Sequence, residues 1–196
     1  YYNSPVLYKE NGFKKKEDAE RLIGELSAEP AGPATVIGIE KKKENKNAPL
    51  LYNLAELQND CSKYFKISPD ETLRIVQELY EKKMTTYPRT DARVLSTAVA
   101  KEIHKNIGGL RNYALAAPFA KEVLEQGTYK NIAKTRYVND KQITDHYAII
   151  PTGQGLNNLA GLAPTAAKVY EVIVRRFLSI FYPPAVYQKF SLTLQV

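Results

Sequence analysis

Three residues in one short stretch carry groups that could together cleave a phosphodiester. Tyr87, Arg89 and Asp91 lie within the run Thr-Thr-Tyr-Pro-Arg-Thr-Asp. A phenol oxygen can attack phosphorus and form a covalent phosphotyrosine, and a guanidinium beside it would stabilise the charge that develops on the phosphate. Pro88 favours extended backbone at Tyr87, which would project Tyr87 and Arg89 to the same side. We therefore predict a tyrosine nucleophile with a phosphate-binding arginine, and expect Asp91 to orient Arg89 or cap a turn.

Other uses of Tyr87 have to be weighed against this one. The chain has 14 tyrosines, so an isolated Tyr-x-Arg is a weak signal, whereas the whole run is far more specific. The rival hypothesis is a non-catalytic, basic single-stranded DNA-binding module in which Tyr87 only stacks on a base. A tyrosine recombinase would place its tyrosine after its arginines and histidine, but here Tyr87 precedes His146. A rolling-circle nuclease would need paired histidines, and His104 and His146 are too far apart.

A second stretch, Asp145–Thr152, brings a histidine into the argument. His146 precedes the apolar run Tyr-Ala-Ile-Ile-Pro, which we expect to be buried beside the tyrosine region. A histidine there could donate to a scissile phosphate or steady a bound nucleotide. Taken from the residues alone, a core histidine satisfied by Asp145 or by the backbone is the favoured alternative. His104, alone on a predicted helix, is assigned no role.

The two stretches together resemble a known family. Thr85–Asp91 looks like the active-site tyrosine motif of type IA DNA topoisomerases, in its topoisomerase III form, and Asp145–Thr152 is similar to the histidine-containing motif of that family. The segment Ala48–Gln58 resembles the start of the family's tyrosine-bearing domain. The resemblance extends from about Ala34 to Val196. It favours a contact between His146 and the bound phosphate over a structural role in the core.

The resemblance implies a bacterial enzyme that relaxes or decatenates DNA without ATP. Tyr87 would attack single-stranded DNA and keep the 5′ phosphate, Arg89 would stabilise that phosphate, and His146 would contact the phosphate or a nucleotide. The family uses a toprim domain that binds Mg²⁺ and supplies a catalytic glutamate. We see no such pattern here, so we expect a central fragment without a metal site of its own, inactive without the toprim domain.

Apolar spacing predicts the elements that would position these residues. Helices are expected over 14–26, 50–65, 69–83, 97–107, 118–126 and 164–181. Strands are expected over 1–8, 35–39 and 190–196, with the last pairing with one of the others, and 41–47 is expected to be an exposed crossing. Ser68, Pro69 and Glu71 form a strong helix start. Tyr80 should face inward, and Arg175 and Arg176 should face solvent.

The predicted fold class is α+β. We expect a mainly helical tyrosine domain over residues 48–182, inserted into a smaller, discontinuous β-rich arch domain. Residues 1–47, including the helix at 14–26, and the returning strand within 183–196 would form that arch. The family's architecture implies this arrangement.

Composition and charge limit the possible partners and compartments. The net charge of +7 over 196 residues favours an anionic partner, and nucleic acid is the first candidate. The single cysteine, Cys61, excludes an internal disulfide and fits a reducing compartment. Two histidines and one cysteine make no zinc site. No apolar run is long enough to span a bilayer and no signal peptide is visible, so we expect a cytoplasmic, nucleoid-associated protein.

Overall fold

The computed structural model describes residues 13–27 and 35–195, and the chain divides into two compact units. One is a helical unit, Asn45–Val186, and the other consists of residues 1–44 together with 187–196. The described part is mostly helical with a two-stranded sheet, so the predicted α+β class is confirmed. In sequence, the helical unit interrupts the other one.

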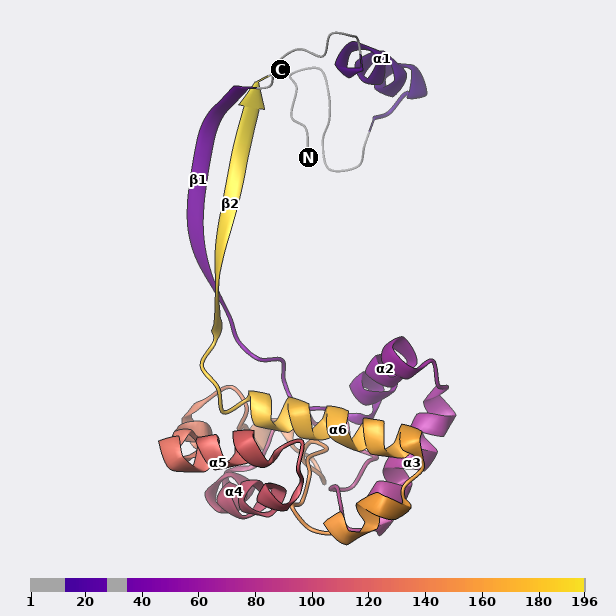
Figure 1. Cartoon of the computed structure of the whole chain (residues 1–196), viewed down its shortest axis with the longest axis vertical. Coiled ribbons are helices and arrows are strands. Elements are labelled where there is room, and N and C mark those ends of the chain that lie inside the picture. Colours follow the sequence, from indigo (N-terminus) through magenta and orange to yellow (C-terminus); the bar gives the residue numbers. More distant parts are fainter. Residues whose placement is uncertain (1–12, 28–34, 196) are drawn as a thin grey trace. The chain divides into compact units, whose positions relative to one another are not determined.

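Five α-helices build the helical unit around one apolar core (Figure 1). Helix α6 (Pro164–Ser179) packs against α3 (Pro69–Glu81) and α2 (Leu54–Phe65), and α4 (Thr97–Gly109) packs against α5 (Ala117–Gln126). Short 3₁₀ segments connect them: η1 (Leu110–Asn112), η2 (Thr128–Lys134), η3 (Asp140–Gln142) and η4 (Leu156–Gly161). The inward side of α6 is fully buried at Val169, Tyr170, Ile173 and Phe177.

Polar caps fix where several of these helices begin and end. The Ser68 hydroxyl accepts the Glu71 N–H at 3.1 Å at the start of α3, as predicted from the sequence. Ser96 caps α4 in the same way, and α5 ends at Gly127 in the left-handed conformation that glycine favours (φ 65°). Each of these caps satisfies a backbone group that the helix itself leaves without a partner.

Helix α2 begins later than predicted, at Leu54 instead of Leu50. Tyr52 pairs instead with Ile149, whose N–H donates to the Tyr52 carbonyl at 2.8 Å. The side chain of Asn53 then caps the helix by accepting the Glu56 N–H. The apolar residues before Asn53 are therefore buried through strand-like pairing instead of through a helix face.

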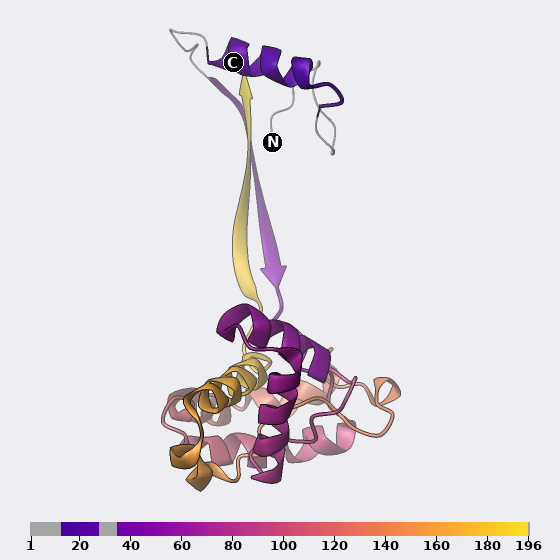
Figure 2. The same cartoon turned by 90° about the vertical axis from the view of Figure 1, so that its right-hand side faces the viewer.

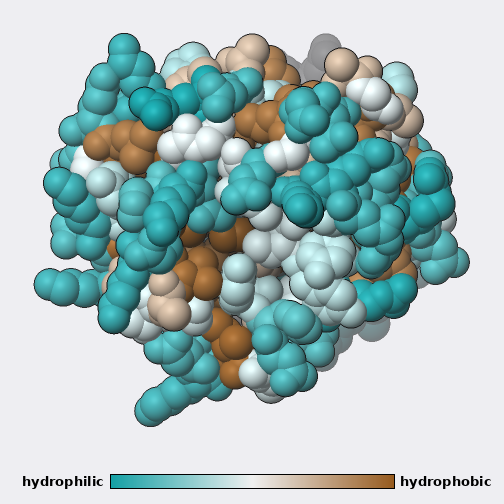
Figure 3. Space-filling view, turned by 90° about the horizontal axis from the view of Figure 1, so that it is seen from below, coloured by the Kyte–Doolittle hydropathy of each residue, from teal (hydrophilic) through white to brown (hydrophobic). Residues whose placement is uncertain are grey.

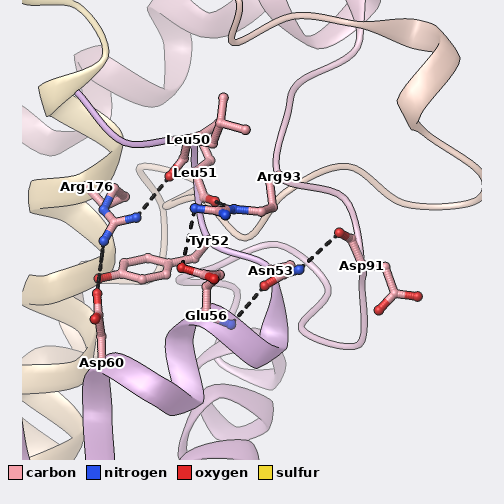
Figure 4. A network of polar contacts seen from close by, with 9 residues as sticks. All are labelled: Leu50, Leu51, Tyr52, Asn53, Glu56, Asp60, Asp91, Arg93 and Arg176. Atoms are coloured by element: carbon pink, nitrogen blue, oxygen red, sulfur yellow. Dashed lines mark hydrogen bonds and ion pairs between the residues drawn. The ribbon is translucent and has the colours of Figure 1, made fainter. Parts of the chain in front are cut away.

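A part-buried polar network around Arg176 corrects the prediction that this residue faces solvent (Figure 4). The guanidinium donates to the Leu50 carbonyl at 2.9 Å, to the Tyr52 hydroxyl at 3.0 Å and to Asp60 at 2.9 Å. It also lies 4.0 Å from the centroid of the Tyr52 ring. Tyr52 in turn donates to Asp60, and burial is the main cause that raises the pKa of Tyr52. Arg175, the preceding residue, is exposed as predicted.

The second unit contains α1 (Lys16–Leu26) and most of a ribbon of two strands, β1 (Thr35–Lys46) and β2 (Ala185–Gln195). The strands run antiparallel (Figure 2). Of the two partners expected for the strand at 190–196, the structure shows the one at 35–39. Gly38 lies against Thr193, and the Lys41 ammonium lies 5.7 Å from the Phe190 ring centroid. The lysine-rich stretch expected as a crossing therefore continues β1. The strand predicted for residues 1–8 lies outside the described residues.

Seen from below, the surface is largely hydrophilic, and apolar side chains reach it in small patches (Figure 3). Within residues 13–27 and 35–195, no helix combines the length and the apolar character needed to cross a membrane.

Candidate active site

The tyrosine stretch follows closely after the end of helix α3. The Met84 N–H donates to the Leu79 carbonyl at 2.9 Å and the Lys83 N–H to the Tyr80 carbonyl at 2.8 Å. This pair of bonds is a Schellman motif, and Lys83 takes its left-handed position with φ 60°. Met84 is fully buried. The helix therefore stops before Tyr87, as the sequence predicted.

The two sequence motifs, about 60 residues apart, pair with each other in the structure. The Thr86 N–H donates to the Ile150 carbonyl at 3.0 Å, and the Thr152 N–H donates to the Met84 carbonyl at 3.0 Å. An antiparallel bridge joins Thr85 to Pro151 between them. The apolar run after His146 is buried here, which confirms its predicted place beside the tyrosine region.

Two threonine hydroxyls, one on each side of Tyr87, connect the tyrosine and histidine motifs by hydrogen bonds. Thr86 donates to the Ala148 carbonyl at 3.0 Å and accepts the Ile150 N–H at 2.9 Å. Thr90 donates to the His146 carbonyl at 3.1 Å and accepts the Ala92 N–H at 3.1 Å. Each hydroxyl donates one hydrogen bond and accepts another, so the backbone that carries Tyr87 is held on both sides.

Tyr87 and His146 lie in contact. Their ring centroids are 4.3 Å apart with an interplanar angle of 36°, and Tyr80 meets Tyr87 edge to face at 5.5 Å. Tyr87 is half-buried and His146 is exposed, so the alternative of a core histidine is wrong. The Tyr87 hydroxyl makes no hydrogen bond with any described residue, which leaves it open to a ligand.

A cavity of about 580 Å³ opens at this pair of rings. Tyr87, His146 and Tyr147 line it together with residues from the end of α3 and from the loop after Pro151; these are Tyr80, Glu81, Lys83, Thr85, Thr86, Thr152 and Gln154. Tyr80 is 40% exposed at its rim, which corrects the prediction that this residue faces inward.

Arg89 and Asp91 lie outside the cavity lining. Arg89 is exposed and forms no hydrogen bond or ion pair with the described residues, so its guanidinium is available to an anion. Asp91 is also exposed, and within the described chain it makes no ion pair with Arg89. Its main-chain carbonyl accepts a hydrogen bond from Asn53 at 3.1 Å (Figure 4). Thr90 provides the side-chain cap in this turn, so neither role expected for Asp91 is observed.

Sequence reasoning missed Tyr80, Lys83 and the two threonines as parts of this site. The threonines stand on either side of Tyr87 in the printed sequence, but their partners come from a distant segment and carry no local signal. The left-handed conformation of Lys83 could not be predicted from the sequence, because glycine is the usual residue at such a position.

The described residues do not provide a metal site. Nowhere in residues 13–27 and 35–195 do three His, Cys, Asp or Glu side chains gather closely enough to hold a metal ion. The side chains at the cavity include phenols, one imidazole, the Lys83 ammonium group and the Glu81 carboxylate.

Comparisons with known proteins find relatives of this chain. A family model described as DNA topoisomerase matches residues 4–196. DNA topoisomerase 3 of Bacillus cereus is 35% identical over 189 residues, which cover 95% of this chain and 25% of that protein. DNA topoisomerase 3 of Bacillus subtilis is 35% identical over 177 residues, 90% of this chain and 23% of that protein. The chain thus spans about a quarter of the length of these curated relatives.

A solved structure shares the fold. Full-length topoisomerase I from Thermotoga maritima superimposes with a TM-score of 0.59 over 98% of this chain and 30% of that chain, at 20% sequence identity.

Proposed function

The chain belongs to the type IA DNA topoisomerase family, and we propose that it supplies the nucleophile with which a longer protein cleaves and rejoins single-stranded DNA. One observation supports this most directly: the half-buried Tyr87 lies against His146 at the mouth of a cavity. The hydrogen bonds of the Thr86 and Thr90 hydroxyls hold its backbone on both sides. A fixed hydroxyl at an open site is what attack on a bound phosphodiester requires.

The proposed step forms one bond and breaks one. The Tyr87 phenol oxygen attacks phosphorus and releases its proton to water. The new O–P bond holds the 5′ phosphate, and the bond from phosphorus to the 3′ oxygen breaks. Arg89, exposed and without a partner among the described residues, stabilises the charge on the phosphate. His146 donates to the phosphate or to the adjoining nucleotide. The departing 3′ oxygen needs a proton, which a toprim carboxyl provides; the reverse step reseals the strand without ATP.

The same proposal covers the surroundings of the site. Residues 48–182 form the tyrosine domain, and residues 1–47 with 183–196 contribute to the β-rich arch. Mg²⁺ binds to the toprim domain of the longer polypeptide, and the protein works on DNA in the bacterial cytoplasm, at the nucleoid. Another strand passes through the gap opened by cleavage, which yields relaxation or decatenation.

Replacing Tyr87 by phenylalanine tests the nucleophile. In a polypeptide of the relatives' length, a 3′-labelled oligonucleotide should form a covalent adduct visible on a denaturing gel, because the protein keeps the 5′ phosphate. Tyr87→Phe should abolish the adduct and leave binding of the oligonucleotide intact. Tyr64→Phe is the matched control, since Tyr64 is an exposed tyrosine on α2. An adduct that persists in Tyr87→Phe would show that another residue is the nucleophile.

The second candidate is a non-catalytic single-stranded DNA-binding module, which the adjoining rings of Tyr87 and His146 would also suit. For that candidate, Tyr87→Phe leaves every activity unchanged. We also expect the 196-residue chain alone not to relax supercoiled DNA. Relaxation by this chain with magnesium would contradict that expectation.

A further inference from the structure

We infer that the cavity beside Tyr87 binds one nucleotide next to the scissile phosphate, with its base on Tyr80 and a phosphate on Lys83. This inference rests on the proposed function and assigns substrate contacts to two residues outside the Tyr87, Arg89 and His146 set. Four features of the cavity support it: a free ammonium group, the backbone at Lys83, the wall beside Lys83, and an exposed aromatic rim with enough space behind it.

The first feature is a free ammonium group. Two oppositely charged side chains at the end of α3 line the cavity, Glu81 and Lys83. Glu81 accepts a hydrogen bond from Gln77 at 3.1 Å, whereas Lys83 forms no ion pair with the described residues. Its neighbour Lys82 is paired with Glu78 at 3.5 Å and lies outside the cavity lining. Of the two lysines, Lys83 is the one open to a phosphate.

The second feature is the backbone at Lys83. A left-handed conformation is unfavourable for residues with a Cβ, and glycine is the usual choice at this position of a Schellman motif. Lys83 keeps φ at 60°, and Lys66 at the end of α2 does the same at 59°. Strain at a residue that lines a cavity suggests that its side chain is needed there. Lys66 does not line this cavity, so it provides an internal comparison.

The third feature is the wall around Lys83. The loop 153–155 closes onto the end of α3 because Gly155 approaches it so closely that a Cβ there would lie 2.3 Å from the Lys82 carbonyl oxygen. Asn158 also donates to that carbonyl, at 3.4 Å. This approach places Gln154 on the same cavity as Lys83. The amide of Gln154 can both donate and accept, as the edge of a base requires.

The fourth feature is an exposed aromatic rim with enough space behind it. Tyr80 is 40% exposed although it lies on the last turn of α3. Aromatic side chains are the usual platforms on which unpaired bases stack. The cavity volume of about 580 Å³ falls within the roughly 300–1,000 Å³ typical of small-ligand sites. Since Tyr80 touches Tyr87, a base on Tyr80 would lie beside the attacked phosphate.

Paired lysine-to-glycine variants test the phosphate contact in this chain. Lys83→Gly and Lys66→Gly each remove one charge and relieve the same backbone strain, so both should keep or raise the melting temperature. A lost phosphate contact lowers the slope of log affinity against log salt by about 0.7 and weakens single-stranded DNA binding about fivefold at 0.1 M salt. We expect this loss, measured by fluorescence anisotropy of a labelled oligonucleotide, in Lys83→Gly alone. Lys83→Gln should reproduce it without changing the backbone. Equal affinities in the two glycine variants would overturn the inference.

A single tryptophan tests the base contact. The chain contains no tryptophan, so Tyr80→Trp and the control Tyr64→Trp each carry one indole. Saturating oligonucleotide should quench Tyr80→Trp fluorescence and leave Tyr64→Trp unchanged; equal responses would contradict stacking on Tyr80.

The outcomes separate this inference from the proposed function. If Tyr87→Phe abolishes the adduct while Lys83 and Tyr80 variants behave like their controls, the nucleotide site is wrong and the nucleophile stands. If the adduct survives Tyr87→Phe while Lys83→Gly still weakens binding, the nucleotide site stands and the nucleophile is wrong.

Discussion

Replacing Arg176 by methionine should destabilise the helical unit far more than the same change at Arg175. Methionine keeps much of the apolar stem, so the change removes mainly the guanidinium. At position 176 three hydrogen bonds and the stacking on Tyr52 disappear. At position 175 only an ion pair with Glu171 at 2.7 Å is lost.

Burial sets the size of the difference. The Arg176 and Asp60 side chains are only 15% and 21% exposed. Removing Arg176 therefore leaves the Asp60 carboxylate without its cation and with little access to water. Removing one partner of a buried ion pair costs about 3–5 kcal/mol, and partial access of water to Asp60 favours the lower end, about 3 kcal/mol. Arg175 is 69% exposed in its pair, and an exposed pair one helical turn apart is worth about 0.3–0.5 kcal/mol.

Thermal and urea unfolding measure both variants. A domain of this size loses roughly 2–4 °C of melting temperature per kcal/mol, so we expect a drop of about 6–12 °C for Arg176→Met and about 1 °C for Arg175→Met. Combining Arg176→Met with Asp60→Asn should recover part of the loss, because the stranded charge disappears. Equal shifts for the two arginine variants would refute the assignment of Arg176 to a stabilising network.

Three further predictions follow from hydroxyl groups that are buried or half-buried. Thr90→Val should lower the free energy of unfolding by about 1–3 kcal/mol, because the Ala92 N–H loses its partner. Thr90→Ser should keep most of the stability in urea unfolding. An unchanged stability in Thr90→Val would contradict the role of the Thr90 hydroxyl in holding the two motifs together. Tyr170→Phe should be neutral or slightly stabilising in the same assay, since the Tyr170 hydroxyl is buried without a hydrogen-bond partner in the described structure. Burial and the Glu122 hydrogen bond raise the pKa of Tyr182 to about 12, whereas an unfolded tyrosine titrates near pH 10. The unfolded chain therefore loses this proton first, stability should fall as pH rises above about 10, and Tyr182→Phe should reduce the slope of melting temperature against pH up to about 12.

The sequence predicted features that depend on local chemistry. Neighbouring residues alone determine the caps at Ser68 and Gly127 and the end of the helix before Tyr87, so the sequence was enough to predict them. The burial of the apolar run after His146 beside the tyrosine region was also expected. Their contact geometry, with rings 4.3 Å apart, required the structure.

The wrong predictions concern residues whose environment is made by distant segments. Arg175 and Arg176 lie about 100° apart around α6, and only the positions of Tyr52 and Asp60 decide which of them is covered. The lysines of β1 show no alternation of apolar and polar residues because side chains there are exposed on the ribbon's faces, so the strand signal was absent. Tyr80 fits an inward helical position by spacing, yet lies at the edge of a cavity.

The antiparallel register of β1 and β2 has a consequence for how the chain can be cut and rejoined. The offset that sets Gly38 against Thr193 and Lys41 against Phe190 places Lys46 opposite Ala185. Paired strands lie roughly 5 Å apart, so the helical unit starts and finishes at almost the same point in space. A short peptide joining those two points would close residues 47–184 into a ring, which could be opened at an exposed loop while every helix keeps its neighbours. The unit is thus suited to circular permutation, and its melting temperature in that form would report the stability of its core without the ribbon.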